Sequence, residues 1–475
     1  MVDNHRELHD LSAREQGELL RRGELSPTEL VSHYLARIEA LNPSLGAFTT
    51  VTPDAALARA TTLESGGSRS APLWGIPLGD KDLERRAGVR TMFGSRAFAG
   101  FVPETSDESV SARDSAGAIS LGKTNTPEFG MTSFTESLVA PPALTPYDLA
   151  LGAGGSSGGA AVAVAAGLLP VAPGSDGGGS VRIPAAATGL VGLKPSRGRV
   201  PSGAGFLSLG GLVSHGPIAR SVGDAALLLD ALLESSPYSY ATGAPTWDGG
   251  AYSNAAVRGE GRFSIGVMTS SPWDQTYSIE VSPEAADALR IATETLAAIG
   301  HGLEETALLP DDSYGWAFTA AWQASAAGLP VEEERLDLLE PMTRWLLERG
   351  RERSGRDLGA ALVALTQYER SVIRQFARFD AVLTPSLALT PRPLGWFDHE
   401  DPERSFEQQC QYTPWTSFVN ASGLPAITLP VHVTAEGLPM GVQLIGRPGG
   451  EHTLLAIGAQ LERRFRWQER HPPQW

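Results

Sequence analysis

The apolar positions of the chain follow two patterns, one with helical spacing and one of short continuous runs. Near the start, Ser12 with Glu15 and Ser26 with Glu29 match capping boxes, in which a serine and a glutamate satisfy each other's backbone donors at a helix start. Apolar residues at spacings of three and four follow the second box. This pattern predicts two helices at the start of the chain.

Further along, short apolar runs bounded by turn residues alternate with segments of helical periodicity. We expect strands within 72–83, 116–125, 263–268, 380–385, 425–433 and 441–446. We expect helices over 160–168, 225–233, 282–300, 332–379 and 452–465. Because strands and helices alternate throughout, the chain is predicted to form α/β layers.

Composition favours a single folded domain. The 475 residues are 42% hydrophobic and 19% charged, which is typical of a globular protein. Length alone suggests about three domains of about 150 residues each. No internal repeat or linker divides the chain, however, so we expect one domain over residues 1–475.

The charge, the single cysteine and the N-terminus narrow the possible partners and location. A net charge of −16 repels phosphate backbones and anionic lipid, so we expect neither nucleic acid nor a membrane surface as a partner. Cys410 alone permits no intramolecular disulfide and no cysteine-based metal site. The N-terminus has no apolar signal region, and the apolar run 160–172 is too short to span a bilayer. These observations predict a soluble cytoplasmic protein.

One nucleotide-binding pattern occurs but lacks its context. "GAISLGKT" (117–124) matches the P-loop letter for letter. A P-loop needs a strand before its first glycine and an open loop between the glycines, whereas "AISL" itself has the pattern of a strand. We therefore expect a strand here and no phosphate cradle.

A glycine-serine cluster raises the question of a nucleophile. "GAGGSSGGAAVAVAAG" (152–167) satisfies G-x-S-x-G at both Ser156 and Ser157, the signature of a nucleophile elbow. The preceding "ALTPYDLALGA" is turn-rich and a poor buried strand. Histidines occur downstream, so the possibility of a Ser-His-Asp hydrolase remains at this point. No H-E-x-x-H or comparable cluster of metal ligands is present.

A second cluster, "GSDGGGSVRIP" (174–184), places three glycines before Ser180. Glycine runs let backbone N–H groups approach a substrate carbonyl, as an oxyanion hole requires. Lys81 follows an apolar strand, where desolvation lowers a lysine pKa and allows it to act as a base. Taken separately, Ser180 is more often a buried serine beside a glycine turn, and Lys81 is more often a solvated lysine.

Together these motifs resemble the amidase signature family. The resemblance also rests on "LGKTNTPEF" (121–129), "GLVGLKPSRGRV" (189–200), "GPIARSVGDAALLLDAL" (216–232) and "GLPAITLPV…EGLPMGVQLIGRP" (423–448). It implies a single large three-layer α/β/α domain, with a mixed, mostly parallel central β-sheet flanked by helices. Its core motifs span 72–232 and 415–465, and the unassigned region of about 235–410 is expected to be helical and to shape the substrate pocket.

The family's residue roles carry over to matching positions. The resemblance implies a Ser–Ser–Lys triad with Ser180 as nucleophile, Ser156 as proton relay after a cis peptide bond, and Lys81 as base. It implies oxyanion-hole and substrate-binding positions at Gly130, Met131, Gly177, Gly178 and Gly179. Supporting positions are Ser157, Asp176 and Arg182. No cofactor and no metal is implied. Gly177 departs from the family, which commonly has a branched residue there, and this implies a roomier loop.

The substrate is left more open. The middle of the chain is rich in aromatic residues that could line an apolar pocket or pack in the core, namely Tyr314, Trp316, Phe318, Trp322, Trp396, Phe397, Tyr412 and Trp415. We expect a hydrophobic amide, anilide or carbamate (urethane) as the small-molecule substrate, cleaved through an acyl-enzyme by a monomer or homodimer. The alternatives are the A subunit (glutaminase) of a tRNA-dependent amidotransferase and a catalytically silent binding protein.

Overall fold

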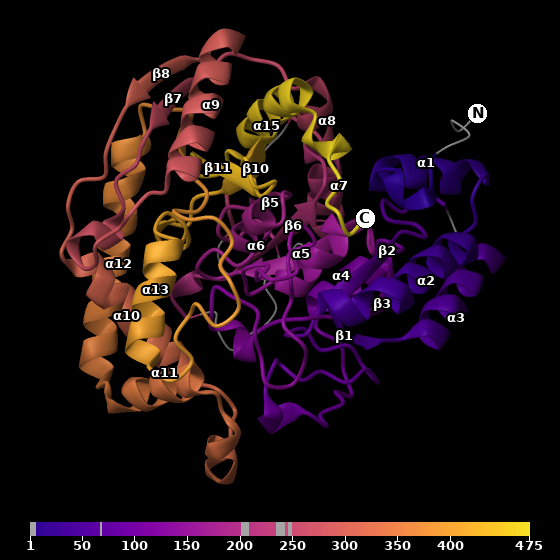
Figure 1. The fold of residues 1–475 in the computed structure, drawn as a ribbon, viewed down its shortest axis with the longest axis horizontal. Coiled ribbons are helices and arrows are strands. Elements are labelled where there is room, and N and C mark those ends of the chain that lie inside the picture. Colours follow the sequence, from indigo (N-terminus) through magenta and orange to yellow (C-terminus); the bar gives the residue numbers. More distant parts are fainter. Residues whose placement is uncertain (1–5, 67–68, 201–208, 234–242, 246–248) are drawn as a thin grey trace.

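The computed structural model describes residues 6–66, 69–200, 209–233, 243–245 and 249–475. The first five residues, and 235–242 and 246–248 of the region expected to shape the pocket, lie outside the described residues. Figure 1 shows the N-terminal helices on one side, a helical layer on the other, and strands between them. Within the described ranges, no helix is long and apolar enough to cross a membrane.

A large mixed sheet forms the centre of the fold. Its eight described strands run in the order β4-β6-β5-β10-β11-β9-β7-β8. Their bounds are β4 Val171–Asp176, β5 Val191–Lys194, β6 Ser214–Ala219, β7 Ser264–Val267, β8 Gly302–Glu305, β9 Ala381–Pro385, β10 Ala426–Val433 and β11 Pro439–Gly446. The mixed sheet flanked by helices is confirmed.

The expectation that this sheet is mostly parallel is wrong. Among the described strands, only β9–β7 and β7–β8 pair in parallel, and the other neighbours pair antiparallel. Two features cause the difference. β6 inserts antiparallel between β4 and β5, and β10 returns directly as a hairpin into β11. A hairpin joins antiparallel strands, whereas parallel neighbours need a crossover.

A smaller sheet carries Lys81. It has the described order β1-β3-β2, with β1 Phe48–Val51, β2 Pro77–Lys81 and β3 Ile119–Thr124. β2 is buried along its whole length, and Lys81 is its last residue. β2 also packs against β4 of the large sheet, which brings Lys81 beside the second glycine-serine cluster. The strand expected in place of the P-loop is present as β3.

Two helical layers cover the large sheet. Side chains alternate across a strand, so neighbouring residues face opposite layers. On β9, Leu383 belongs to the core cluster that includes residues of α7, α9 and α15, whereas Val382 belongs to the cluster that includes residues of α10, α12 and α14. The helices of the first layer are α7 Val222–Leu233, α9 Pro283–Ile299 and α15 Glu451–Phe465. Those of the second are α10 Ser313–Ala327, α12 Gly355–Phe376 and α14 Ser417–Ala421. The three-layer arrangement is therefore present.

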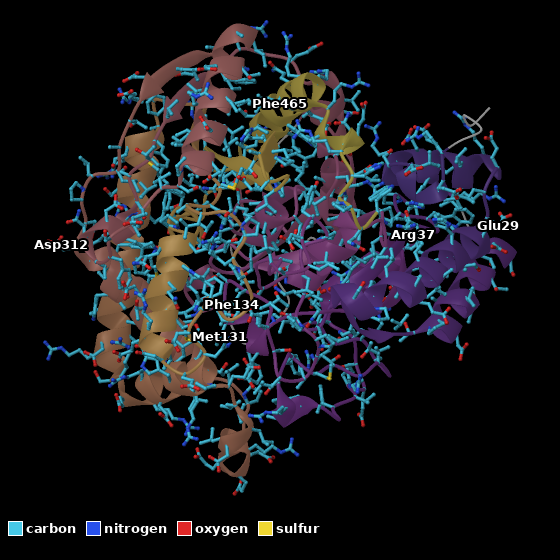
Figure 2. All side chains as sticks on the ribbon, viewed as in Figure 1. Glu29, Arg37, Met131, Phe134, Asp312 and Phe465 are labelled. Carbon is cyan, nitrogen blue, oxygen red and sulfur yellow. The ribbon has the colours of Figure 1, made fainter. Side chains whose placement is uncertain are left out.

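The remaining helices pack around these layers. They are α1 Ala13–Arg22, α2 Pro27–Leu45, α3 Pro53–Ser65, α4 Glu108–Ser115, α5 Gly158–Ala165, α6 Arg182–Ala187, α8 Tyr252–Arg258, α11 Pro341–Glu352 and α13 Pro402–Tyr412. Both predicted capping boxes form at the starts of α1 and α2. Glu29 and Asp312 lie at opposite edges of the molecule, while Met131 and Phe134 lie between them in its interior (Figure 2).

The region 235–410 is not helical alone. It supplies α8 to α13 and also β7, β8 and β9, which complete one edge of the large sheet. The single-domain organisation over 1–475 stays a prediction.

Candidate active site

Lys81 and Ser156 meet in the interior. Lys81 Nζ lies 2.7 Å from Ser156 Oγ. The same nitrogen lies 3.1 Å from Ser175 Oγ and 3.3 Å from the Ser175 carbonyl oxygen. Lys81 is 1% exposed and Ser156 is 2% exposed, so neither side chain has much contact with bulk water. A lysine amine held against a serine hydroxyl can pass a proton to or from it.

Ser156 follows a cis peptide bond to Gly155. Ser157, the next residue, donates its backbone N–H to the Ser180 carbonyl oxygen at 3.1 Å, which ties the two glycine-serine clusters together. Among the described residues, no hydrogen bond joins Ser156 Oγ to Ser180 Oγ. Catalytic hydrogen bonds are often long before substrate binds, so this gap is compatible with a relay.

The pKa of Lys81 is lowered. Burial disfavours the ammonium form and lowers the pKa to about 7, although the Asp176 and Glu84 carboxylates oppose the shift. A lysine with an ordinary pKa is almost fully protonated at neutral pH. At a pKa of about 7, a large fraction of Lys81 is instead neutral and able to accept a proton.

The glycine loop before Ser180 is anchored by Asp176. Its carboxylate accepts the Gly179 N–H at 2.8 Å and the Val181 N–H at 3.2 Å. Asp176 also forms a buried two-point contact with the Arg182 guanidinium, at 2.9 and 3.0 Å. Burial raises the pKa of Asp176, but the Arg182 charge more than offsets this and holds the pKa at about 2. The loop therefore rests on a carboxylate that is ionised at neutral pH.

This anchoring changes the expected oxyanion hole. The Gly179 N–H already has an acceptor in Asp176, so it is not free to bind a substrate oxygen. The N–H groups of Gly177, Gly178 and Ser180 make no hydrogen bond to any described residue. Gly179 instead serves the turn: its φ is +131°, and a Cβ there would meet Ile183 and Thr416 at 2.6 Å.

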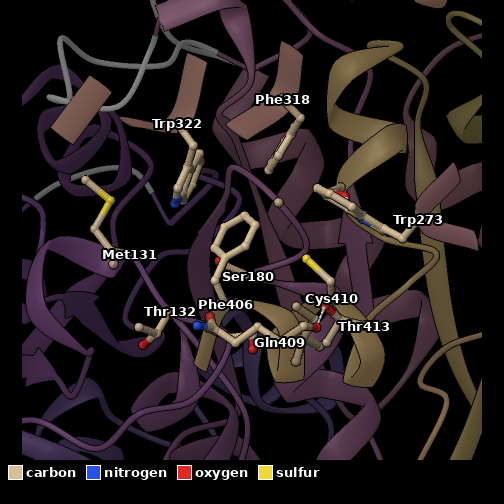
Figure 3. A pocket seen from close by; sticks show the side chains of 15 residues that line it. Met131, Thr132, Ser180, Trp273, Phe318, Trp322, Phe406, Gln409, Cys410 and Thr413 are labelled. Atoms are coloured by element: carbon tan, nitrogen blue, oxygen red, sulfur yellow. Dashed lines mark hydrogen bonds between the residues drawn. The ribbon is translucent and has the colours of Figure 1, made fainter. Parts of the chain in front are cut away.

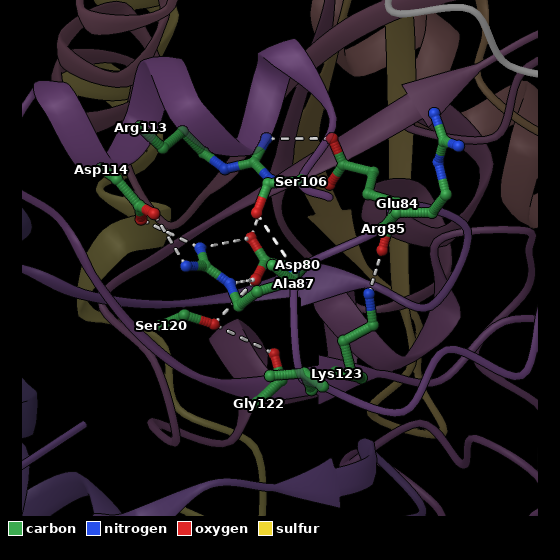
Figure 4. Close-up of polar contacts among 12 residues, drawn as sticks. Asp80, Glu84, Arg85, Ala87, Ser106, Arg113, Asp114, Ser120, Gly122 and Lys123 are labelled. Atoms are coloured by element: carbon green, nitrogen blue, oxygen red, sulfur yellow. Dashed lines mark hydrogen bonds and ion pairs between the residues drawn. The ribbon is translucent and has the colours of Figure 1, made fainter. Parts of the chain in front are cut away.

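A charge network surrounds the buried carboxylates of Asp80 and Glu84, which lie close to Lys81 in the chain (Figure 4). Arg113 pairs with Asp80 at 2.7 Å and with Glu84 at 2.8 Å. Arg86 pairs with Asp80 at 2.5 Å, and Lys123 donates to the Glu84 carbonyl oxygen. Asp80 and Lys81 are consecutive strand residues, so their side chains point to opposite faces. Fixing Asp80 therefore also fixes the direction of Lys81. Lys123, which stood in the P-loop pattern, is part of this network and not of a phosphate site.

Ser180 faces a cavity walled by aromatic residues (Figure 3). Phe318 and Trp322 of α10 stack with ring centroids 5.7 Å apart, and Trp273 meets Phe318 edge-on at 5.9 Å. The lining residues are Gly130, Met131, Thr132, Ser133, Gly178, Ser180, Ile183, Trp273, Phe318, Trp322, Phe406, Gln409, Cys410, Thr413 and Ser417. None of these fifteen described residues has an ionisable carboxyl, amine, guanidinium or imidazole.

The structure separates the eight aromatic residues considered for the pocket. Phe318 and Trp322 line the cavity. Trp316, on the same helix, is 45% exposed. The other five lie outside the cavity lining: Tyr314 and Trp415 in one core cluster, and Trp396, Phe397 and Tyr412 in another. Gly130 and Met131 also line the cavity.

Sequence reasoning missed several residues of the site. Ser175 contacts Lys81, and it lies in the second glycine-serine cluster near the end of β4. Its place on this strand was the only sign in the sequence of a role in the site. Trp273, Phe406 and Gln409 line the cavity from segments without a recognisable motif. Within the described part of the chain, no three His, Cys, Asp or Glu side chains form a group able to hold a metal ion.

Comparison with known proteins places the chain among amidases. The model of the family described as Amidase matches residues 29–455. Putative amidase AmiB2 of Mycobacterium tuberculosis is 37% identical over 97% of this chain and 97% of its own. The A subunit of the glutamyl-tRNA(Gln) amidotransferase of Roseiflexus sp. is 33% identical over 98% of both chains.

Two solved structures show the same fold. The structure of 6-aminohexanoate cyclic dimer hydrolase complexed with substrate matches with a TM-score of 0.89 and 31% identity, over 98% of this chain and 100% of that chain. A bacterial aryl acylamidase of the amidase signature enzymes matches with a TM-score of 0.85 and 27% identity, over 97% of both chains.

Proposed function

The chain belongs to the amidase signature family of amide-hydrolysing enzymes, and on that premise we propose that it hydrolyses uncharged, hydrophobic amides, anilides or carbamates at Ser180. The observation that carries the proposal is the cavity over Ser180, which is walled by aromatic rings and lined by no ionisable carboxyl or basic group among its described residues. Apolar surface of this kind stabilises apolar substrates by removing them from water.

The proposed reaction begins with proton transfer through the Lys81–Ser156 contact. Ser180 Oγ attacks the amide carbon and forms a C–O bond, while its proton passes through Ser156 Oγ to the neutral Lys81 amine. The carbonyl oxygen becomes an oxyanion that the N–H groups of Gly177, Gly178 and Ser180 stabilise. Each such donor is typically worth about 3–4 kcal/mol in the transition state.

The C–N bond then breaks. The proton returns from Lys81 through Ser156 to the leaving nitrogen, because an amine anion leaves too poorly to be expelled without it. An acyl group remains on Ser180 Oγ. Water attacks this ester through the same relay and releases the acid, restoring Ser180. The reaction consumes one water and needs no cofactor.

The A subunit of a tRNA-dependent amidotransferase is the second candidate, since one such protein is 33% identical to this chain. A protein of that kind would hydrolyse free glutamine. Free glutamine carries an α-ammonium and an α-carboxylate, and a buried charge without an opposite partner costs several kcal/mol. The uncharged lining of the cavity therefore favours a neutral substrate over glutamine.

A substrate panel tests the proposal. The purified protein is offered p-nitroacetanilide, a long-chain fatty amide, an aryl carbamate and glutamine, and product release is followed for each. We expect hydrolysis of neutral substrates without hydrolysis of glutamine, and no turnover by Ser180→Ala. Ser111→Ala, on the exposed side of α4, is the matched control. Glutamine hydrolysis without hydrolysis of any neutral amide would overturn the proposal in favour of the glutaminase candidate.

A further inference from the structure

A polar pair in the cavity has no role in the proposed reaction. Ser133 and Gln409 are 276 residues apart in the chain, and both line the cavity. The Ser133 backbone N–H donates to Gln409 Oε1 at 2.8 Å. Because an N–H can only donate, this contact fixes which end of the Gln409 amide is the oxygen. The nitrogen must therefore point to the other side.

The remaining polar atoms of the pair lack partners. Gln409 Nε2 and Ser133 Oγ are both buried, and neither makes a hydrogen bond within the described structure. Each residue is only 8% exposed. Buried polar atoms in folded proteins are nearly always paired, so two unpaired atoms on neighbouring residues of one cavity suggest a partner that arrives from outside. Figure 3 shows the Gln409 side chain extending from its helix toward Thr132.

The two atoms complement an amide group. The Gln409 NH₂ can only donate, so it suits a carbonyl oxygen, and the Ser133 hydroxyl can accept an N–H. A ligand amide offers both a carbonyl oxygen and an N–H. A carboxylate or an ammonium fits less well, because the described cavity lining holds no opposite charge.

We propose that Ser133 and Gln409 form a subsite for a second, uncleaved amide group of the substrate. The preferred substrates are then uncharged diamides or longer oligoamides, of which one amide is cut at Ser180 while another binds the pair. This inference rests on the proposed hydrolysis at Ser180. The aromatic walls alone would select substrates only by size and apolarity. The subsite adds a requirement for a second polar group.

Three uncharged amides of equal length test the subsite. One has plain alkyl chains, one has a second amide in its acyl part, and one has a second amide in its amine part. Amine release gives kcat/KM, and mass spectrometry identifies the bond cleaved. One of the two diamides is expected to exceed the plain amide by about tenfold, as one or two hydrogen bonds to otherwise unpaired buried groups would give.

Two variants remove the pair separately. Gln409→Met keeps the length of the side chain but loses the donor. The kcat/KM of the diamide should therefore fall to about that of the plain amide. Ser133→Ala loses only the hydroxyl and keeps the N–H that orients Gln409, so the preference falls partway. Gln411→Met is the control. Gln411 lies on the same helix but outside the cavity, so its substitution should leave the diamide preference unchanged.

Each outcome decides the proposal. Equal kcat/KM for all three amides in the native protein overturns the subsite but leaves hydrolysis at Ser180 standing. A diamide preference that survives both Gln409→Met and Ser133→Ala also overturns the subsite alone. If no amide is cleaved, the proposed function fails and the subsite fails with it. If Gln409→Met does not fold, the native preference and Ser133→Ala still decide.

Discussion

Lys81 Nζ lies 2.7 Å from Ser156 Oγ, although 75 residues separate the two in the chain. The contact joins the end of β2 to the first glycine-serine cluster, and both residues are buried. Because the Ser156 hydroxyl is hydrogen-bonded to the Lys81 amine, it is suited to carry a proton. We therefore propose Ser180, which faces the cavity, as the nucleophile.

Removing either member of the contact is expected to impair turnover without unfolding the protein. Lys81→Ala removes the base and should abolish measurable hydrolysis. Ser156→Ala breaks the relay and should lower kcat by about 10²–10⁴-fold, the range typical of general acid–base groups. Steady-state kinetics gives the rates, and circular dichroism checks the fold. Near-native kcat in Ser156→Ala would exclude it as the relay.

The rate should fall at acid pH. Burial lowers the pKa of Lys81 to about 7, and only the neutral amine can accept a proton. Protonation below that pKa removes the base, so kcat should reach half its plateau near pH 7 and fall about tenfold for each further pH unit. A kcat profile between about pH 5 and 9 measures this.

Asp82 offers the control for the pH profile. Burial raises the pKa of this neighbouring carboxyl to about 7, so it titrates in the same range as Lys81. Its carboxylate accepts the Met92 N–H and does not contact Ser156. Asp82→Asn should therefore keep the acid limb. A flat profile in the native protein, or loss of the limb in Asp82→Asn, would contradict Lys81 as the titrating group.

The elements were more predictable than their pairing. Local patterns indicated the buried runs that became β2, β3, β7, β9, β10 and β11, because burial and turn residues leave a local trace. The insertion of β6 between β4 and β5 leaves no such trace, since it depends on contacts between distant segments. The alternation of strands and helices predicted α/β layers, which form, whereas the mostly parallel sheet that the family resemblance implied does not.

The site divides in the same way. Lys81, Ser156 and Ser180 lie in motifs whose glycines and neighbours mark them in the sequence. The cavity walls carry no such marks: Trp322 lines the cavity while Trp316, six residues earlier on the same helix, is exposed. Ser133 and Gln409 come together only through the fold. Helical packing decides which aromatic residues face the cavity, and a single sequence does not contain that information.

Arg113 should be essential for stability. It is 1% exposed and pairs with both Asp80 and Glu84. Arg113→Met leaves two buried carboxylates short of their main partner, which should lower the free energy of unfolding by about 3–5 kcal/mol. Denaturant unfolding measures this change. The exposed Arg290→Met, which breaks helix-surface pairs with Asp287 and Glu294, should have no measurable effect. Equal stability of the two variants would contradict a structural role for the buried network.

The glycine loop should respond differently at its two ends. A Cβ at Gly177 would meet the Trp322 ring at 3.3 Å, so Gly177→Ala should shift that ring slightly and raise KM a few-fold for aromatic substrates. A Cβ at Gly179 would meet Thr416 at 2.6 Å in a positive-φ backbone, so Gly179→Ala should abolish activity or folding. Michaelis constants and thermal melting measure both. A harmless Gly179→Ala would show that the loop does not need this turn.

Covalent labelling tests the central claim most directly, because it asks which serine attacks. The native protein is treated with a serine-reactive sulfonyl fluoride, digested, and the labelled residue is identified by mass spectrometry. Labelling is predicted at Ser180, and it should be lost in Lys81→Ala, which lacks the base. Labelling at Ser156 or Ser157, or undiminished labelling of Ser180 without Lys81, would contradict the account.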